Sequence, residues 1–251
     1  MDLEAYELFS RQIPFLGEKN QDLLAKAKVA VVGAGGLGSH VSGMLVRIGF
    51  GHVRIIDRDL VEESNLPRTS LYDRRDIGKA KAFVAHEKLA CINARGRVES
   101  SVETLHAYNA EKLLGGFDVV VDCTDNMGAR YAINKFCVRN NIPWVYGAVM
   151  RDEGLSATFA AAGRPCFACL YPEKPRKVEK TEEAGVISPV IGMIASLQAM
   201  EAMKIITQIS EPSYSRLFRI KLERPGFELL AIKTREDCPV CGKDILTFRR
   251  K

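Results

Sequence analysis

Apolar and polar positions in the first 150 residues form short apolar runs separated by longer amphipathic stretches. The runs carry few polar residues, which is typical of strands buried on both faces of a parallel sheet, and the stretches between them have helical spacing. The predicted strands are 29–32, 52–57, 117–122 and 142–146, and the predicted helices are 37–48, 78–93 and 126–139. Strands that alternate with helices predict a doubly wound, mostly parallel, Rossmann-like α/β sheet.

The pattern changes in the second part of the chain. Residues 154–161 favour a strand of a more antiparallel region, and residues 215–232 favour a hairpin with its turn at Pro225-Gly226. A serine followed by a proline is typical of a helix start, so Ser188 is the predicted N-cap of a helix that runs to about residue 206. We therefore expect an antiparallel portion that continues the parallel sheet.

Composition and charge narrow the class of protein. The chain has 251 residues, 47% hydrophobic and 27% charged, which is ordinary for a globular protein. A net charge of +5 does not favour nucleic-acid binding, and no apolar run approaches the roughly 18 residues of a membrane span. The first residues are acidic and lack the layout of a signal peptide. We expect a cytoplasmic protein that binds neither nucleic acid nor membrane.

A glycine-rich turn follows the first predicted strand and opens the first predicted helix. Gly33, Gly35 and Gly38 have the spacing of a dinucleotide fingerprint, and Gly36 adds a fourth glycine. Such a turn lets backbone N–H groups and the helix N-terminus bind a phosphate. Asp57 ends the next strand, where a carboxylate accepts hydrogen bonds from ribose hydroxyls. Alone, this pattern favours an NAD-binding domain, and a tight turn without a ligand is the other alternative.

Charged and amide side chains after the second and third predicted strands change this prediction from NAD to ATP. A phosphoryl-transfer site needs cations to neutralise the phosphates as the leaving group departs, and a dehydrogenase needs no such cluster. A carboxylate just beyond a parallel strand, such as Asp125, can hold Mg²⁺ through water. For either Arg68 or Lys81 alone, a solvated surface position is the favoured interpretation. The candidate residues in these segments are Asp59, Asn65, Arg68, Lys81, Asp125 and Asn126.

Several motifs in order resemble the ThiF/MoeB/HesA family of the ubiquitin-activating-enzyme superfamily, and most closely its MoeB-type adenylyltransferases. The resemblance runs from residue 10 to residue 242. It is carried by the glycine turn, Ser64-Asn65-Leu66-x-Arg68, Asp122-Cys123-Thr124-Asp125-Asn126, Glu183-Ala184-Gly185-Val186 and the helix segment 196–202. It implies attack by the C-terminal carboxylate of a small ubiquitin-like or sulfur-carrier protein ending in Gly-Gly on the α-phosphate of ATP. The products are an acyl-adenylate and pyrophosphate, in a pathway such as molybdopterin or thiamine synthesis.

The resemblance also implies a role for each matching residue. Asp57 corresponds to the ribose ligand, and Asn65, Arg68 and Lys81 correspond to residues around the phosphates. Asp125 corresponds to the carboxylate linked to Mg²⁺ and to catalysis. Arg11 corresponds to an arginine that enters the active site of the partner subunit, which implies a homodimer. The predicted catalytic residues are Arg11, Arg68, Lys81 and Asp125.

Four of the seven cysteines form two C-x-x-C pairs, Cys166 with Cys169 and Cys238 with Cys241. An odd cysteine count argues against a disulfide framework, and two such knuckles suit a tetrahedral zinc ion. The wide separation of the pairs makes spacing alone weak evidence, but the resembled family has paired knuckles in the same places. We expect structural zinc in a C-terminal zinc-knuckle region. A redox pair is the less favoured alternative.

We expect a single adenylation domain over residues 1–251. Its parts are a helical arm at 1–27, a Rossmann-like ATP-binding part at 28–150 and a zinc-stabilised second part at 151–251. The second part includes a mobile crossover loop at 171–187, which is rich in Pro, Lys and Glu.

One departure from the family concerns the crossover loop. Some members carry a cysteine there that accepts the activated partner or sulfur, but no cysteine lies between Cys169 and Cys238 in this chain. We therefore expect adenylation only, with sulfur or an amine delivered by another protein. Cys123 is a fallback nucleophile, although a small buried hydrophobe is the better prediction for it.

Three other functions remain as alternatives. They are an NAD(P)-dependent oxidoreductase, an inactive partner subunit of an activating enzyme, and the same chemistry on a ribosomal peptide or a tRNA base.

Overall fold

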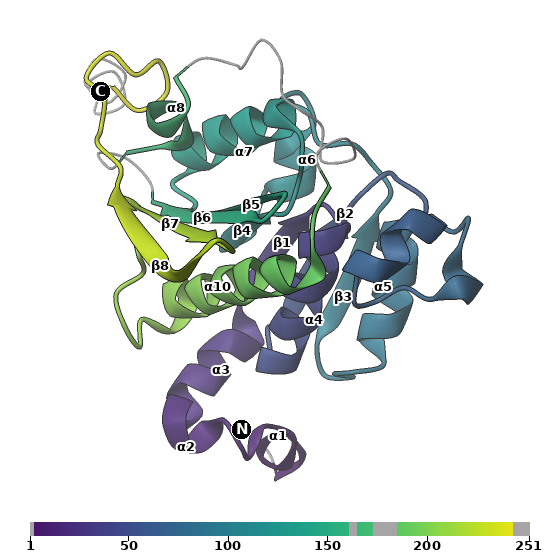
Figure 1. Cartoon of the computed structure of the whole chain (residues 1–251). Coiled ribbons are helices and arrows are strands. Elements are labelled where there is room, and N and C mark those ends of the chain that lie inside the picture. The colour runs from purple at the N-terminus through teal and green to yellow at the C-terminus, as the bar shows by residue number, and fades with distance from the viewer. Residues whose placement is uncertain (1–2, 161–164, 173–184, 243–251) are drawn as a thin grey trace.

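An eight-stranded sheet forms the centre of the structure (Figure 1). The computed structural model describes residues 3–160, 165–172 and 185–242. The strands are β1 (Lys28–Val32), β2 (His52–Ile56), β3 (Arg97–Ser101), β4 (Val119–Asp122), β5 (Trp144–Met150), β6 (Glu153–Phe159), β7 (Arg216–Lys221) and β8 (Arg224–Ala231). Their order is β3-β2-β1-β4-β5-β6-β7-β8. The pairs from β3 to β5 are parallel and those from β5 to β8 are antiparallel, which confirms the predicted continuation.

Helices cover both faces of the parallel part. One face carries α4 (Gly36–Ile48), α5 (Lys81–Ala90) and α10 (Ser188–Thr207), and the other carries α6 (Ala110–Leu114), α7 (Met127–Asn140) and α8 (Phe167–Leu170). Alternate residues of β1 divide between two apolar cores: Val29 and Val31 pack in the first, Ala30 and Val32 in the second. Because successive side chains of a strand point to opposite faces, a strand covered on both faces must be apolar throughout.

Helix α10 crosses the sheet against α4 and β5. By length and composition it is apolar enough to span a membrane, but half of that apolar window is buried in the protein. Two of its polar residues are fully buried and bond to the sheet: Gln198 Nε2 donates to the Asp122 carbonyl, and Glu201 Oε2 accepts from the Thr158 hydroxyl. These bonds are those of a core helix.

The N-terminal arm consists of α1 (Leu3–Phe9), α2 (Ile13–Leu16) and α3 (Glu18–Lys26). Gly17, with φ of +79°, separates the last two helices. Two 3₁₀ helices, η1 (Glu63–Arg68) and η2 (Arg74–Asp76), lie between β2 and α5.

Three local predictions need correction. Lys221 pairs with Arg224, so the hairpin turns at residues 222–223, three residues earlier than predicted, and residues 225–226 form an irregularity in β8. Proline cannot donate to the ladder, which suits it to such an irregularity. The N-cap of α10 is Ile187 and not Ser188, and it makes no side-chain cap bond. The predicted helix at 78–93 is shorter, at Lys81–Ala90, and strand β3 follows it. Most of the predicted crossover loop, residues 173–184, lies outside the described residues.

Candidate functional site

Two turns meet where the strand order reverses. Strands β1 and β4 are neighbours, and the chain proceeds from β1 toward β2 and β3 on one side and from β4 toward β5 on the other. Ligands of open α/β sheets bind at such a switch point, beyond the carboxyl ends of the strands. The glycine turn follows β1 and the turn 122–126 follows β4. A Cβ placed on Gly33 would lie 2.7 Å from the carbonyl oxygen of Cys123, so the two turns are in contact.

Packing explains which glycines the first turn requires. Gly33 has a φ of +94°, and a Cβ on Gly38 would lie 1.9 Å from the carbonyl oxygen of Gly33. Neither position can accept a larger residue without moving the turn. Gly35 differs, because a Cβ there would meet no atom within 4 Å. The turn therefore closes on itself at Gly33 and Gly38 and is open at Gly35.

Acidic residues after β2 hold the turn and the start of α5. Asp57 Oδ2 accepts from the N–H of Ala34 at 2.6 Å, and its Oδ1 accepts from the N–H of Asp59 at 2.7 Å. Burial raises the pKa of Asp57, and these two N–H groups oppose the rise. Lys81 Nζ lies 3.4 Å from Asp59 Oδ2, with 11% of its side chain exposed. Each carboxylate oxygen of Asp57 keeps a lone pair for a further donor.

Helix η1 brings Asn65 and Arg68 beside the glycine turn. A Cβ on Gly36 would lie 3.5 Å from the Arg68 carbonyl oxygen. Asn65 is buried and completes a capping box with Glu62, accepting from its N–H at 3.2 Å. Arg68 is half-buried and bonds from Nη1 to the carbonyl of Ser64. Asn65 thus uses its side chain to fix the helix that carries Arg68.

A buried ion pair holds the backbone of the second turn. The N–H and the hydroxyl of Thr124 donate to Asp122 Oδ1 at 2.9 and 2.7 Å. Arg130 donates from Nη2 to the Thr124 carbonyl, and its Nε lies 3.5 Å from Asp122 Oδ2. The guanidinium also lies over the Tyr146 ring, 5.1 Å from its centroid. Every polar group of Thr124 is therefore bonded, which fixes the direction in which Asp125 leaves the turn.

Asp125 and Asn126 are exposed at the start of α7. Asn126 is the N-cap, and its Oδ1 accepts from the N–H of Gly128 at 2.7 Å and of Ala129 at 3.3 Å. Asp125 is thus presented to solvent beside a helix N-terminus, a place that suits a carboxylate.

Cys123 is no candidate nucleophile. It is buried behind the second turn, and burial raises the pKa of its thiol well above the usual range. The reactive form of cysteine is the thiolate, which this site disfavours. The small hydrophobe that the sequence favoured is the better description.

Four buried residues take part in this geometry but were not predicted as site residues: Tyr72, Asp122, Arg130 and Gln198. Each bonds to the backbone or the side chains of a turn. Asp122 and Gln198 lie in segments that carry the family resemblance, and Gln198 is also a polar residue in an otherwise apolar helix.

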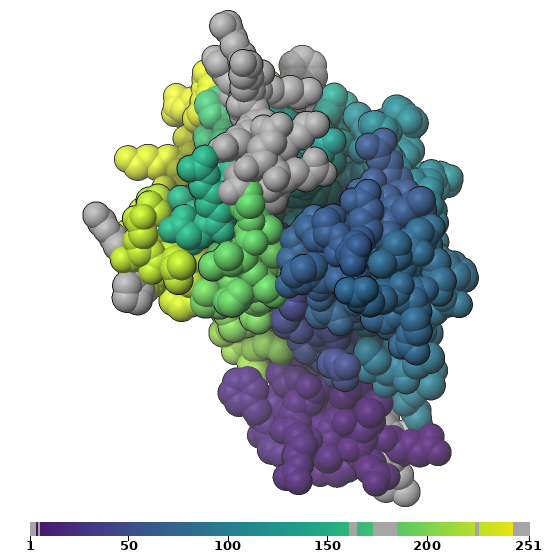
Figure 2. All heavy atoms as spheres, turned by 45° about the vertical axis from the view of Figure 1, so that its right-hand side comes forward, coloured from purple at the N-terminus to yellow at the C-terminus, as the bar shows by residue number. Residues whose placement is uncertain are grey.

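Arg11 lies apart from the other candidates. Its neighbour Gln12 donates from Nε2 to the carbonyl of Ile48 at 2.8 Å, at the end of α4 opposite the glycine turn. Helix α4 has 13 residues and is therefore about 20 Å long. Figure 2 shows the arm as a projection at the base of the molecule. Within one chain, Arg11 is too far away to act at the switch point.

The four paired cysteines come together on the second core face, near α7 and α8. Their Sγ atoms all lie within 4.8 Å of one another, and the cluster is mostly buried. Cys166 Sγ is 3.7 Å from Cys238 Sγ, and Cys169 Sγ is 3.4 Å from Cys241 Sγ. A Cβ on Gly242 would lie 2.6 Å from the carbonyl of Cys238, so the second knuckle requires a glycine.

The sequence matches a protein-family model and known proteins over nearly its whole length. A model described as the ThiF family matches residues 9–240. The sulfur carrier protein adenylyltransferase of Thermus thermophilus is 37% identical, over 96% of this chain and 92% of that protein. The SAMP-activating enzyme E1 of Haloferax volcanii is 35% identical, over 97% and 91%.

Solved structures of Escherichia coli MccB have the same fold. MccB with MccA-N7isoASN superposes with a TM-score of 0.84 at 25% identity, over 95% of this chain and 75% of the MccB chain. MccB with ATP gives 0.81 at 26%, over 93% and 74%. With a family model and close relatives that span nearly its whole length, the chain belongs to the ThiF family.

Proposed function

We propose that this protein is an ATP-dependent adenylyltransferase that activates the C-terminal carboxylate of a small ubiquitin-like or sulfur-carrier protein. A carboxylate oxygen attacks the α-phosphorus of ATP, the bond from that phosphorus to the bridging oxygen breaks, and pyrophosphate leaves. The product is an acyl-adenylate. The observation that carries the proposal is the junction of the two turns at the switch point, in a chain 37% identical to a sulfur carrier protein adenylyltransferase.

The chemistry asks the protein to hold two anions together, because both the carboxylate and the triphosphate are negative. The backbone N–H groups at the start of α4 would bind phosphate oxygens, and Asp57 would accept from the ribose. Lys81, beside Asp59, and Arg68, beside Gly36, would offset the charge of the phosphates. Asn65 would keep η1 in place.

Magnesium would be held through Asp125. Among the described residues, only the cysteine cluster groups three or more His, Cys, Asp or Glu side chains closely enough to share a metal ion. The described residues at the switch point therefore include no such group around Asp125. Magnesium usually keeps several waters and binds through one or two carboxylates and substrate phosphates. An exposed Asp125 next to the phosphate-binding turn fits that arrangement.

The position of Arg11 supports a homodimer. It lies near the far end of α4, so it can serve the site only in another copy of the chain. The exposed apolar residues of the arm, Phe15 at 78% and Leu8 at 51%, are suited to such a contact. Each active site would then contain residues from two chains.

The cysteine cluster fits zinc. Four thiolates at about 2.3 Å from a tetrahedral ion lie about 3.8 Å apart, close to the two distances observed. Asn134 Nδ2 and the N–H of Arg235 each point at a cluster sulfur, at 3.5 Å, and such donors support thiolates. The ion would link α8 to the C-terminal segment and take no part in the reaction.

Sulfur would come from another protein after the adenylate forms, because no cysteine lies between Cys169 and Cys238 and Cys123 is buried. We place the reaction in the cytoplasm.

Pyrophosphate exchange tests the proposal. The protein, incubated with ATP, Mg²⁺, labelled pyrophosphate and a carrier ending in Gly-Gly, should return label to ATP only when the carrier is present. Asp125→Ala and Arg68→Ala should lower exchange by about 10²-fold or more. Arg74→Ala, which removes an 83% exposed arginine outside the site, is the matched control and should keep the wild-type rate. Undiminished exchange in the first two variants would refute the site.

A peptide substrate is the second candidate, since MccB with an MccA peptide has the same fold. Replacing the carrier by an MccA peptide in the same assay separates the two. Identity along nearly the whole chain to carrier enzymes favours the carrier.

A further inference from the structure

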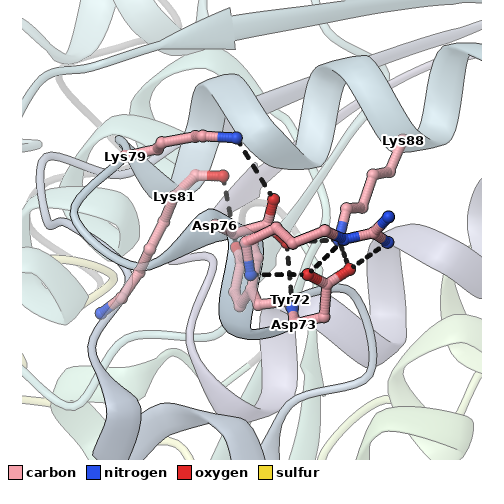
Figure 3. A network of polar contacts seen from close by, with 7 residues as sticks. Tyr72, Asp73, Asp76, Lys79, Lys81 and Lys88 are labelled. Atoms are coloured by element: carbon pink, nitrogen blue, oxygen red, sulfur yellow. Dashed lines mark hydrogen bonds and ion pairs between the residues drawn. The ribbon is translucent and has the colours of Figure 1, made fainter.

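Tyr72 lies between the glycine turn and the start of α5. It is 7% exposed, and its hydroxyl donates to the carbonyl of Ala34 at 2.7 Å. The carbonyl of Lys81 lies 3.3 Å from the same hydroxyl. Figure 3 shows this carbonyl directed at Tyr72, while the Lys81 side chain extends away from it. One buried hydroxyl thus lies between the phosphate-binding turn and the backbone of Lys81, the proposed phosphate-binding lysine.

The backbone of Ala34 is fixed on both sides. Its N–H donates to Asp57, and its carbonyl accepts from Tyr72. In a planar trans peptide the C=O and the following N–H point in opposite directions. The bond to Tyr72 therefore turns the N–H of Gly35 away from the protein interior. No described group accepts this N–H, and a Cβ on Gly35 would meet nothing within 4 Å, so Gly35 is not packed against the rest of the protein on that side of its Cα.

Tyr72 is itself held in place by the charged network that follows it (Figure 3). The N–H of Asp73 donates to Asp76 Oδ2 at 2.9 Å, and Lys88 of α5 bonds to both carboxylates. Burial raises the pKa of Tyr72, so its hydroxyl stays protonated and remains a donor at any working pH. The tyrosine is thus anchored to α5 and directed at the turn.

We propose that Tyr72 is a positioning residue for phosphate binding: by holding the Ala34 carbonyl it orients the Gly35 N–H toward the phosphates of a nucleoside triphosphate. This inference rests on the proposed function. Tyr72 need not touch the nucleotide, because it acts through the turn. Without its hydroxyl the Ala34–Gly35 peptide is free to rotate, and the N–H no longer has a fixed direction.

Tyr72→Phe tests the inference, since it keeps the ring and removes the donor. Isothermal titration would measure binding of ATP, and of adenosine, which has the base and ribose but no phosphate. The dissociation constant for ATP should rise by about 5- to 10-fold, as for the loss of one hydrogen bond, and the KM for ATP in the exchange assay should rise with it. Adenosine binding should not change.

Tyr131→Phe is the matched control. It removes another tyrosine hydroxyl that donates to a backbone carbonyl, that of Tyr171, at 2.6 Å and away from the glycine turn. It should leave both affinities at their wild-type values, even where it lowers the melting temperature.

Three results would overturn the inference. They are an unchanged ATP affinity in Tyr72→Phe, an equal loss for ATP and adenosine, and the same ATP-specific loss in Tyr131→Phe. Wild-type protein that binds no ATP would instead refute the proposed function. The two failures are therefore distinguishable.

Discussion

Asp122 makes the stability of this protein depend on pH in an unusual direction. The side chain is fully buried, and burial raises its pKa from 3.8 to about 6, against the opposing charge of Arg130. A raised pKa means that the folded state binds the proton more tightly than the unfolded state does. Its contribution to stability therefore grows as the pH falls through 6, is complete near 3.8, and is absent above 7.

The magnitude follows from the two pKa values. A difference of about 2 units corresponds to about 3 kcal/mol between the fully charged and fully protonated limits. Between pH 7.5 and pH 5.0 the linkage relation gives about 1.4 kcal/mol of that change. The weak pairing is consistent with the raised pKa, because Asp122 Oδ2 and Arg130 Nε lie 3.5 Å apart and neither has a hydrogen-bond partner among the described residues.

Asp122→Asn isolates the effect, since asparagine keeps an oxygen for the N–H and hydroxyl of Thr124 and cannot titrate. Urea unfolding of both proteins at the two pH values gives the change in the free energy of unfolding for each. Between pH 7.5 and pH 5.0 the wild type should gain about 1.4 kcal/mol relative to the variant. Other groups cancel in this comparison, including Asp73, whose pKa the hydrogen bonds from Arg75 and Lys88 lower. An equal pH dependence in both proteins would refute the reasoning.

Three further predictions concern the dimer, the metal and the glycine turn. Arg11→Ala and Asp125→Ala should each be inactive in pyrophosphate exchange. When the two variants are mixed after dissociation, about half of the dimers contain one chain of each and have one intact site of two, so about a quarter of the wild-type rate should return. No recovery would contradict a shared site. A chelator strong enough to remove zinc should lower the melting temperature of the wild type without abolishing binding of ATP, and well-folded protein free of zinc by elemental analysis would contradict the structural role. Gly38→Ala should abolish measurable ATP binding, because its methyl group would lie 1.9 Å from the Gly33 carbonyl oxygen. Gly43→Ala, at a position of the same helix with open space around it, should bind ATP normally. Normal binding in both variants would contradict the packing of the turn.

Hydrophobic pattern predicted most of the sheet because its central strands are buried on both faces. Strand β3 was not predicted, because it is an edge strand in which only Val98 is buried and the remaining residues are polar. Its sequence therefore lacks the apolar run on which the prediction relied. The turn predicted at Pro225 and Gly226 was wrong for another reason. They are typical of a turn, but the register of β7 and β8 places the turn at residues 222–223.

Some residues of the candidate site could likewise be placed from the sequence, and others could not. The glycine turn and Asp57 could be placed from sequence because each lies within a few residues of a predictable strand end. Tyr72 and Gln198 could not, because their bonds join residues 38 and 76 positions apart in the chain. No local pattern contains such a contact. Arg130 is close in sequence to the turn that it holds, but helical spacing does not distinguish a buried arginine from a solvated one.

The residues that sequence missed share one physical task, which is to hold main-chain groups. Tyr72 bonds to Ala34, Arg130 to Thr124, and Gln198 to the carbonyl of Asp122. A phosphate that binds to backbone N–H groups depends on the direction of those groups, and the backbone has no side chain of its own with which to fix it. The nucleotide meets charged residues such as Asp125 and Lys81, and the buried layer sets the direction of the N–H groups that it meets. A substitution in the buried layer that keeps the charge, such as Tyr72→Phe, should change nucleotide affinity, and a substitution of Asp125 should change the rate of the chemical step.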